Sequence, residues 1–289
     1  MNVTLSNHYI TAIVDSQGAE LQSLKKSDSD VEYIWKADPN IWGRHAPILF
    51  PIVGKLKDNT YRYEGQEYHL SQHGFARNMN FKKLIEEKDM VLMEMQESDE
   101  TLRVYPFHFS LQISYYLWKN ILYSKFQVHN TDSKPIYFSI GGHPGFSCPI
   151  DPNQSRSDHY LEFEKTESAE SHILENGVIS KRTKPVFRGK KIQLTDSIFD
   201  EDALILKNLS SEKVALKDGN GSSLLNFHFP NFPYLGIWSQ KDAPAYVCIE
   251  PWHGLADNAD HSGDLTTKEG IQKLEPEGVF TCEYGIEIE

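Results

Sequence analysis

Two side chains of this sequence could act together in acid–base chemistry. His143 lies in the stretch FSIGGHPGF, between two glycines and a Pro-Gly pair, directly after a short apolar run. Glu250 lies in YVCIEPWHGLAD, at the end of another apolar run. An unperturbed histidine has a pKa of about 6.5 and an unperturbed glutamate one of about 4.3, so a glutamate base and a partly protonated histidine acid can coexist at neutral pH. One imidazole and one carboxylate are the minimum set for paired general acid and base catalysis.

The neighbouring residues predict that both side chains stand at strand ends. The glycines remove side-chain bulk beside His143 and the Pro-Gly pair turns the chain, so we expect the imidazole to be presented where a strand ends. In AYVCIEP, alternation places Tyr246, Cys248 and Glu250 on one face of a strand that Pro251 stops. A carboxylate at the mouth of a sheet is costly to bury without a partner.

Two further segments are richer in polar side chains than a sheet core requires. WGRHAPILFPIVGKL carries Arg44, and YHLSQHGFARNMNF carries His73 and Arg77 on either side of Gly-Phe-Ala. The loop EPWHGLADNADH gathers histidines and aspartates, but their spacing matches no metal motif, so we expect an exposed acidic loop there. The sequence contains no phosphate-binding loop, nucleophile elbow or dinucleotide fingerprint.

Each of these side chains also has a purely structural interpretation. His143 could be a structural or solvated histidine, and Glu250 could cap a backbone amide at the rim of a sheet. His73 could be buried and hydrogen-bonded, and both arginines could form ordinary surface ion pairs. The residue types alone leave these alternatives open.

The elements that hold these segments are predicted to be β-strands. Residues 110–130 alternate apolar and polar side chains on both sides of Lys119-Asn120, as a hairpin does, and KVALKDGNGSSLLNFHF does the same around Asn-Gly. Further strand-like runs are VEYIW, MVLMEM, PIYFSI, YLGIW, AYVCIE and CEYGIEI. Helical patterns are few: TESAESHILENG predicts a turn or two of helix, and DPNIWGRHAP predicts a short helical turn before Pro47. Many short strands separated by turn residues predict an all-β sandwich or barrel that forms one domain over residues 1–289.

Composition limits the partners of the chain. It has 289 residues and a formal net charge of −12, which argues against nucleic acid and anionic membranes. No run approaches the roughly 18–20 apolar residues of a membrane span, and the first residues lack the pattern of a signal peptide. Three cysteines without paired spacing favour a reducing compartment and argue against both a disulfide framework and a cysteine-based zinc site. We therefore expect a soluble, cytoplasmic globular protein.

Five segments together resemble a known family. GRHAPILFPIVGKL, YHLSQHGFARN, GGHPGF, FDEDALIL and IEPWHGLAD, in that order, resemble the aldose 1-epimerase (galactose mutarotase-like) family, and more closely its LacX-type branch. The resemblance spans roughly residues 40–257 and, with the flanking strands, covers most of the chain. It implies a large antiparallel β-sandwich with a sugar site in a cleft on one sheet. It also implies a small-molecule sugar as partner, no cofactor and no metal, in a monomer or homodimer.

The resemblance implies a role for both acid–base residues. Glu250 is similar to the family's general base, which takes the proton of the anomeric hydroxyl. His143 is similar to the general acid, which protonates the ring oxygen so that the sugar ring opens. The free aldehyde rotates about C1–C2 and the ring closes on the opposite face. On this interpretation the glycines beside His143 let the sugar approach the backbone.

The resemblance also implies which residues hold the sugar. His73 matches a histidine that hydrogen-bonds the sugar near its ring oxygen, and Arg44 matches an arginine that holds hydroxyl groups. Asp202 matches an aspartate that accepts hydroxyl donors, although Asp200 lies two residues away on the same predicted strand face. Trp252 could stack on an apolar face of the sugar or could fill the core.

Three functions follow from the resemblance. The first is an aldose 1-epimerase, an isomerase that interconverts the α and β anomers of a free hexose. A sister branch acts on hexose 6-phosphates, and Arg44 and Arg77 lie where guanidinium groups could hold a phosphate. The third is a non-catalytic sugar-binding or sensing domain, against which the presence of both His143 and Glu250 counts. The histidine segments are shorter than in galactose-specific members, so a preference for galactose is not implied.

Overall fold

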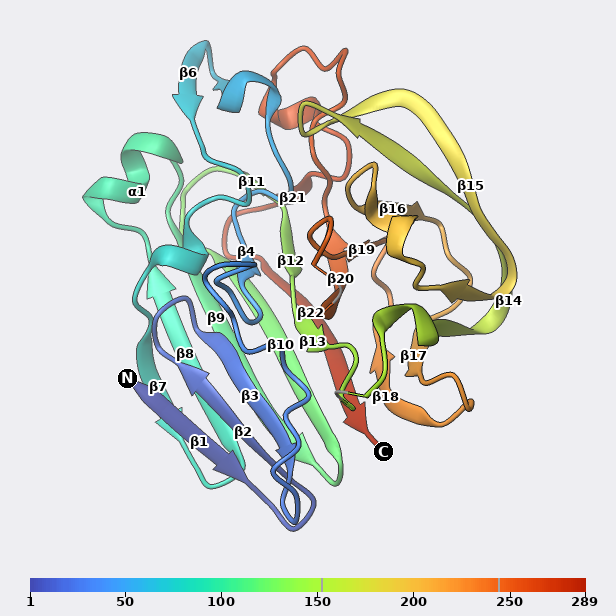
Figure 1. Cartoon of the computed structure of the whole chain (residues 1–289). Helices are drawn as coiled ribbons and strands as arrows, with labels where there is room; N and C mark the ends of the chain where they lie inside the picture. The colour runs from blue at the N-terminus through green and yellow to red at the C-terminus, as the bar shows by residue number, and fades with distance from the viewer. Residues whose placement is uncertain (152, 244) are drawn as a thin grey trace.

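The chain folds mainly into antiparallel β-strands, as expected for an all-β protein (Figure 1). The structure is a computed structural model that describes residues 1–151, 153–243 and 245–289. Its largest sheet has nine strands in the order β15-β14-β17-β18-β22-β10-β9-β8-β7. These strands are β7 (Lys82–Glu86), β8 (Met90–Gln96), β9 (Phe109–Trp118), β10 (Ile121–Asn130), β14 (Tyr160–Glu175), β15 (Val178–Gln193), β17 (Lys213–Lys217), β18 (Ser223–His228) and β22 (Val279–Ile288).

A six-stranded sheet packs against one face of the nine-stranded sheet. Phe146 of the smaller sheet meets Phe227 of the larger one with ring centroids 5.9 Å apart, and both rings are buried. The order of the smaller sheet is β16-β19-β20-β12-β4, with β13 also paired to β20. Its strands are β4 (Ile48–Leu49), β12 (Ile140–Gly142), β13 (Gly145–Ser147), β16 (Leu204–Lys207), β19 (Tyr234–Trp238) and β20 (Tyr246–His253).

A three-stranded sheet covers the other end of the same face. Its link to the nine-stranded sheet includes the buried hydroxyl of Tyr115, which donates to the carbonyl of Ala19 at 2.8 Å. The remaining strands form two short antiparallel pairs, the hairpin β5–β6 and the long-range pair β11–β21. The strands of these three sheets are β1 (Asn2–Ser6), β2 (Ile10–Asp15), β3 (Glu20–Lys26), β5 (Thr60–Tyr63), β6 (Gln66–His69), β11 (Ile136–Phe138) and β21 (Gln272–Leu274).

The helices among the described residues are short. None of them is long and apolar enough to cross a membrane. The helices are η1 (Lys57–Asn59), η2 (Ala76–Asn78), α1 (Asp99–Val104), η3 (Arg156–Asp158), η4 (Asp196–Phe199) and η5 (Leu265–Thr267). The sequence analysis missed α1, although Ser98 and Thr101 form the reciprocal capping box that begins a helix.

Both predicted hairpins are confirmed. β9 and β10 pair along their whole length around Lys119, which has the positive φ of 55° that such a turn requires. The side chains of β10 alternate between partly exposed and buried, so every second residue enters the core. β17 and β18 likewise pair around the Asn-Gly turn. The largest apolar cluster among the described residues runs from Val3 to Ile288.

Both helical predictions are wrong. TESAESHILENG forms the end of β14 and its turn, because buried Ala169, Ser171 and Ile173 alternate with more exposed neighbours at the period of a strand. The Asn176-Gly177 pair supplies two positive φ values for a hairpin turn, which was a readable sequence signature. DPNIWGRHAP contains a turn at residues 39–41 and no helix. In the predicted strand VEYIW, Ile34 alone pairs, in an isolated β-bridge with Phe146.

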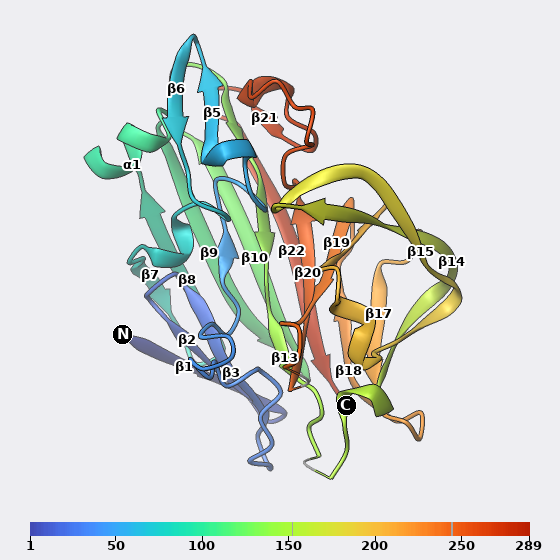
Figure 2. The same ribbon diagram turned by 45° about the horizontal axis from the view of Figure 1, so that its top comes forward.

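The β14–β15 hairpin reaches from the edge of the large sheet to the face of the small one. Only residues 160–163 of β14 pair with β17, and beyond them β14 and β15 pair with each other. Three register shifts interrupt this pairing, and such irregularities bend a hairpin. Figure 2 shows the resulting arm curving over the edge of the six-stranded sheet. Its tip is fixed there, because Ile179 donates its N–H to the carbonyl of Asp257 at 2.7 Å.

We predict that the core of the large sheet carries much of the stability. Phe126 is fully buried on β10, so Phe126→Ala should lower the free energy of unfolding by about 3–5 kcal/mol. The adjacent Gln127 points to the other face, and Gln127→Ala should change it by less than about 0.5 kcal/mol. Urea denaturation followed by circular dichroism measures both. Equal effects of the two substitutions would contradict the assigned faces.

Candidate active site

A cavity of about 370 Å³ on the six-stranded sheet gathers most of the predicted site residues. Its volume lies near the lower end of the range of about 300–1,000 Å³ that is typical of small-molecule sites. Six of the seven predicted residues line it: His73, Arg77, His143, Asp202, Glu250 and Trp252. Arg44 is the predicted residue that does not.

His143 and Glu250 face each other in this cavity. Nε2 of His143 lies 3.2 Å from Oε2 of Glu250, although the two residues are more than a hundred positions apart in the sequence. Both are buried, with exposed fractions of 7% and 1%. Nδ1 of His143 and Oε2 of Glu250 have no hydrogen-bond partner among the described residues. The dyad is therefore positioned for a ligand that supplies hydrogen bonds.

Burial favours the uncharged form of both groups. It lowers the pKa of His143 to about 3, and the positive charge of Arg77 acts in the same direction. It also raises the pKa of Glu250 well above its ordinary value, and the negative charge of Asp202 adds to this effect. Burial therefore favours the state in which the carboxyl group, and not the imidazole, carries a proton. Its transfer to the imidazole produces a carboxylate and an imidazolium.

His143 is held by backbone and aromatic contacts. It follows directly after β12, as predicted, and its N–H donates to the carbonyl of Pro47 at 3.0 Å. Trp42 stacks on the imidazole with ring centroids 4.9 Å apart, and Trp238 meets it edge-on at 5.7 Å. Both indoles line the cavity. These contacts restrict the ring to one orientation, which acid catalysis requires.

The glycines beside His143 make room for aromatic side chains of the protein. A Cβ at Gly142 would lie 2.7 Å from Tyr284, and one at Gly145 would lie 2.7 Å from Trp42. A Cβ at Gly141 would similarly meet the indole of Trp252 at 2.6 Å. The expectation was that these glycines let a sugar approach the backbone, but side chains of the protein occupy this space. The glycines let aromatic rings approach the backbone, and the rings shape the cavity.

Glu250 lies inside a strand, which corrects a further prediction. β20 continues through Pro251 and Trp252 to His253, so Pro251 does not end it. The strand runs between β19 on one side and β12 with β13 on the other. Cys248 and Glu250 were predicted to lie on one face of this strand, and this is confirmed because both side chains approach His143. Glu250 thus projects from the middle of the sheet instead of its rim.

His73 offers a hydrogen-bond donor to the cavity. Its Nδ1 accepts the N–H of Gly54 at 3.1 Å, which leaves the hydrogen of the neutral ring on Nε2, and this Nε2 lies 3.3 Å from the side-chain amide of Gln72. Burial and the charges of His143 and Arg77 lower its pKa well below the ordinary value, which keeps the ring neutral. The His73 and His143 rings meet edge-to-face at 5.7 Å. A neutral donor beside the dyad can bind a sugar oxygen without competing for the proton.

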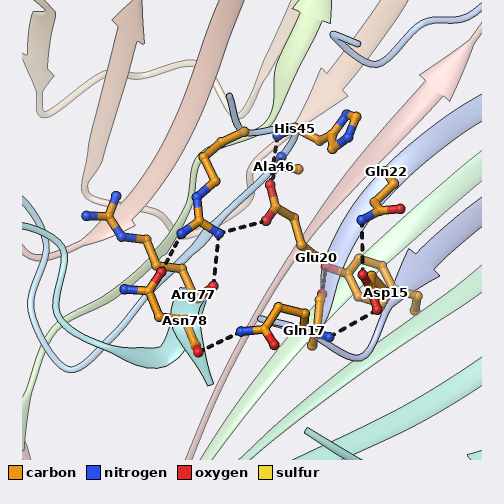
Figure 3. A network of polar contacts seen from close by, with 11 residues as sticks. Asp15, Gln17, Glu20, Gln22, His45, Ala46, Arg77 and Asn78 are labelled. Carbon is orange, nitrogen blue, oxygen red and sulfur yellow. Dashed lines mark hydrogen bonds and ion pairs between the residues drawn. The ribbon is translucent and has the colours of Figure 1, made fainter. Parts of the chain in front are cut away.

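The two arginines have different positions. Arg77 lines the cavity, and its Nη2 donates to the carbonyl of Gln72 at 2.8 Å. Arg44 lies behind it and binds the carboxylate of Glu20, the carbonyl of Arg77 and the side chain of Asn78. Figure 3 shows Glu20 at the centre of this network, while the Arg77 side chain points away from it. The structure therefore does not support direct contact of Arg44 with a sugar.

Of the two candidate aspartates, Asp202 lines the cavity. Asp200 is exposed and lies 3.5 Å from Lys241 in an ion pair. Asp202 precedes β16 with a positive φ of 73°, and its Oδ1 accepts the N–H of Ala203. The two residues therefore do not share a strand face, contrary to the prediction.

The loop after β20 is more ordered than the sequence indicates. Asp257 is buried, with one oxygen 3.0 Å from Nζ of Lys268 and the other accepting the N–H of Lys57. Lys268 also donates to the carbonyl of Leu255 at 2.6 Å. The expected exposed acidic loop is therefore wrong at Asp257, although Asp260 is exposed and pairs with Lys181. This buried ion pair fixes the loop that follows Trp252.

The lining residues that sequence reasoning missed include two tryptophans and two residues of the β14–β15 arm. Trp42 lies two residues before Arg44 in WGRHAPILFPIVGKL, so its position near a candidate residue was a usable signal. Trp238 ends the strand-like run YLGIW, and no sequence signal distinguished it. Leu174 and Gly177 come from the tip of the β14–β15 arm. They could not have been found without recognising the hairpin, because the segment was assigned to a helix.

Comparisons with known proteins identify the family of the chain. The model of a family described as aldose 1-epimerase matches residues 1–271. The chain belongs to the aldose 1-epimerase family. Protein LacX, encoded on a plasmid of Lactococcus lactis subsp. lactis, is 31% identical over 298 residues, which cover 100% of this chain and 99% of LacX. The predicted resemblance to the LacX-type branch is thereby confirmed.

Solved structures share the fold over the whole chain. A galactose mutarotase related enzyme from Lactobacillus acidophilus is 37% identical with a TM-score of 0.96, over 100% of this chain and 97% of that one. A galactose mutarotase-like protein from Lactobacillus casei ATCC 334 is 31% identical with a TM-score of 0.93, over 100% of both chains. The protein therefore has the galactose mutarotase-like fold, as predicted.

We predict that Gly236 is needed to seat Trp252. Gly236 pairs with Glu250 across β19 and β20, and a Cβ there would collide with the Trp252 ring. Gly236→Ala should lower the free energy of unfolding by about 1–3 kcal/mol through overpacking. Urea denaturation measures the loss. The matched control is Gly43→Ala, whose Cβ would have its nearest neighbour at 3.6 Å, and an equal loss in both variants would contradict the assignment.

We also predict that Arg44 acts on stability. Arg44→Gln removes the cation beside the buried Glu20 carboxylate and should lower the free energy of unfolding by about 1–3 kcal/mol. Arg77→Gln should instead weaken sugar binding, because this side chain lines the cavity. Denaturation and calorimetric titration with a hexose separate the two effects. A stable Arg44→Gln protein that has lost sugar binding would show that Arg44 contacts the sugar.

Proposed function

We propose that the protein is an aldose 1-epimerase that interconverts the α and β anomers of a hexose. The observation that carries the proposal is the pairing of a buried carboxyl group and a buried imidazole, 3.2 Å apart, in a cavity of about 370 Å³. A cyclic hexose carries its anomeric hydroxyl and its ring oxygen on the same carbon. One acid and one base must therefore reach two neighbouring oxygens, and this dyad has that spacing.

In the proposed reaction, Glu250 as carboxylate accepts the proton of the anomeric hydroxyl. The C1–O1 bond becomes a carbonyl, the bond between C1 and the ring oxygen breaks, and His143 as imidazolium protonates the ring oxygen. Rotation about C1–C2 and the reverse proton transfers close the ring on the other face. His73 donates to a sugar oxygen, and Asp202 accepts from a hydroxyl group.

The charged lining favours a neutral sugar over a hexose 6-phosphate. Arg77 lines the cavity together with Asp202, whereas Arg44 is engaged by Glu20. A phosphate would thus meet one guanidinium and a nearby carboxylate instead of a pair of arginines. A purely sugar-sensing role gains no support, because the dyad keeps its facing geometry.

We predict that both dyad residues are required for turnover. Glu250→Gln and His143→Asn should each lower kcat by about 10²–10⁴-fold, the usual contribution of general acid or base catalysis. Polarimetry or proton NMR of freshly dissolved α-glucose, α-galactose and glucose 6-phosphate measures the rates. Control variants that leave the rate unchanged are Glu287→Gln and His228→Asn. These residues form a pair 3.0 Å apart that does not line this cavity.

The alternatives give different outcomes in the same experiment. Acceleration of glucose 6-phosphate alone would move the assignment to a hexose-6-phosphate mutarotase. Sugar binding by calorimetry without acceleration of any anomer would support a sensing domain. Full activity in folded Glu250→Gln and His143→Asn proteins would exclude the proposed mechanism.

A further inference from the structure

A third side chain lies beside the dyad and has no part in the proposed reaction. Cys248 precedes Glu250 by two positions on β20, so both side chains project from the same face of the strand. Its Sγ, a ring nitrogen of His143 and a carboxylate oxygen of Glu250 all lie within 4.8 Å of one another. All three residues are buried. Among the described residues, this is the one group of such donors with metal-binding spacing.

Two of these three residues hold atoms that are free to bind. Nδ1 of His143 and Oε2 of Glu250 are buried without a hydrogen-bond partner among the described residues. Both residues line the cavity, which gives a ligand from solvent access to them. The other two cysteines, Cys148 and Cys282, are also buried and free, but they lie outside this group.

We propose that His143, Cys248 and Glu250 bind a thiophilic divalent cation such as Zn²⁺, and that this binding inhibits the enzyme. A sulfur, an imidazole nitrogen and a carboxylate oxygen suit Zn²⁺ and disfavour Mg²⁺ and Ca²⁺, which prefer oxygen ligands. Zinc ligands lie about 2.0–2.3 Å from the metal, so the three donors must move together by about 1 Å. The fourth position of a tetrahedral site faces the cavity and is open to water.

The charges of the site are compatible with a buried dication. On binding, the thiol of Cys248 and the carboxyl group of Glu250 each release a proton to solvent, and a metal–sulfur and a metal–oxygen bond form. The thiolate, the carboxylate and the dication then have no net charge, which lowers the cost of burying them. Arg77 repels the cation and Asp202 attracts it, so these two lining charges oppose each other.

Inhibition follows because the cation occupies both members of the dyad. With Glu250 and His143 coordinated, neither can exchange a proton with a sugar. The cation and the sugar therefore compete for the same cavity. This inhibitory effect rests on the proposed epimerase function, whereas the binding of the cation does not.

Cobalt provides the direct test of binding. Titration of the wild-type protein with Co²⁺ should produce the near-ultraviolet absorption of a cobalt–thiolate bond. Cys248→Ser should abolish this band, and the matched control Cys282→Ser should retain it. His143→Asn should weaken the affinity by at least about tenfold, by analogy with the losses seen when metal sites are perturbed. A folded wild-type protein without the band, or a band unchanged in both Cys248→Ser and His143→Asn, overturns the proposal.

Zinc tests the inhibitory effect. Zn²⁺ should slow anomer interconversion, and a chelator or a higher sugar concentration should restore the rate. Relative to its own metal-free rate, Cys248→Ser should need at least about tenfold more Zn²⁺ for the same inhibition. Equal sensitivity of this variant and the wild type overturns the inhibitory site. If the wild type accelerates no sugar, the epimerase proposal fails, while the cobalt titration still decides whether the cation binds.

Discussion

The burial of a carboxyl group next to an imidazole is the constraint on which the rest of the site depends. Each group alone prefers its uncharged form in this environment, as the opposite pKa shifts of Glu250 and His143 indicate. Nε2 of His143 and Oε2 of Glu250 lie 3.2 Å apart, so the two groups face each other directly. In the proposed reaction the carboxylate–imidazolium form opens the ring and the uncharged form remains afterwards. Burial thus favours the state that follows ring opening, and the hydroxyl groups of a bound sugar would have to stabilise the charged state.

The surrounding packing keeps these two groups in place. Trp42 stacks on His143. Trp252 lies on the same strand as Glu250 and packs in an apolar cluster. Both indoles fit only because glycines face them, at Gly145 for Trp42 and at Gly236 for Trp252. The same glycines therefore matter for the geometry of catalysis without touching the substrate.

The sequence contained enough information to predict most strands, two hairpins and the candidate residues His143 and Glu250, but not how the strands assemble into sheets or that these two side chains face each other. Strand alternation identified β9, β10, β17 and β18, because apolar and polar side chains alternate along their sequences. It failed for the distal part of β14, where polar Ser171 takes a buried position between Ala169 and Ile173, so the sequence does not show the alternation that burial does. Pro251 was a misleading stop, since a proline can lie within a strand where its missing N–H is not needed. The position of Arg44 depends on Glu20, a contact across 24 residues that spacing cannot show.

The wide separation of the cavity residues along the chain has a consequence for folding. The segment that follows β4 and the loop that follows β20 lie beside each other at the cavity. The hydrogen bond from Lys57 to Asp257, two residues 200 positions apart, joins them. The arm then closes on the same loop through Ile179. Contacts between such distant residues form late, because closing a long chain segment costs entropy before any contact repays it. The strands can thus pair before the cavity is complete. Binding of a sugar would therefore report that folding is complete, whereas a measurement of strand content would not.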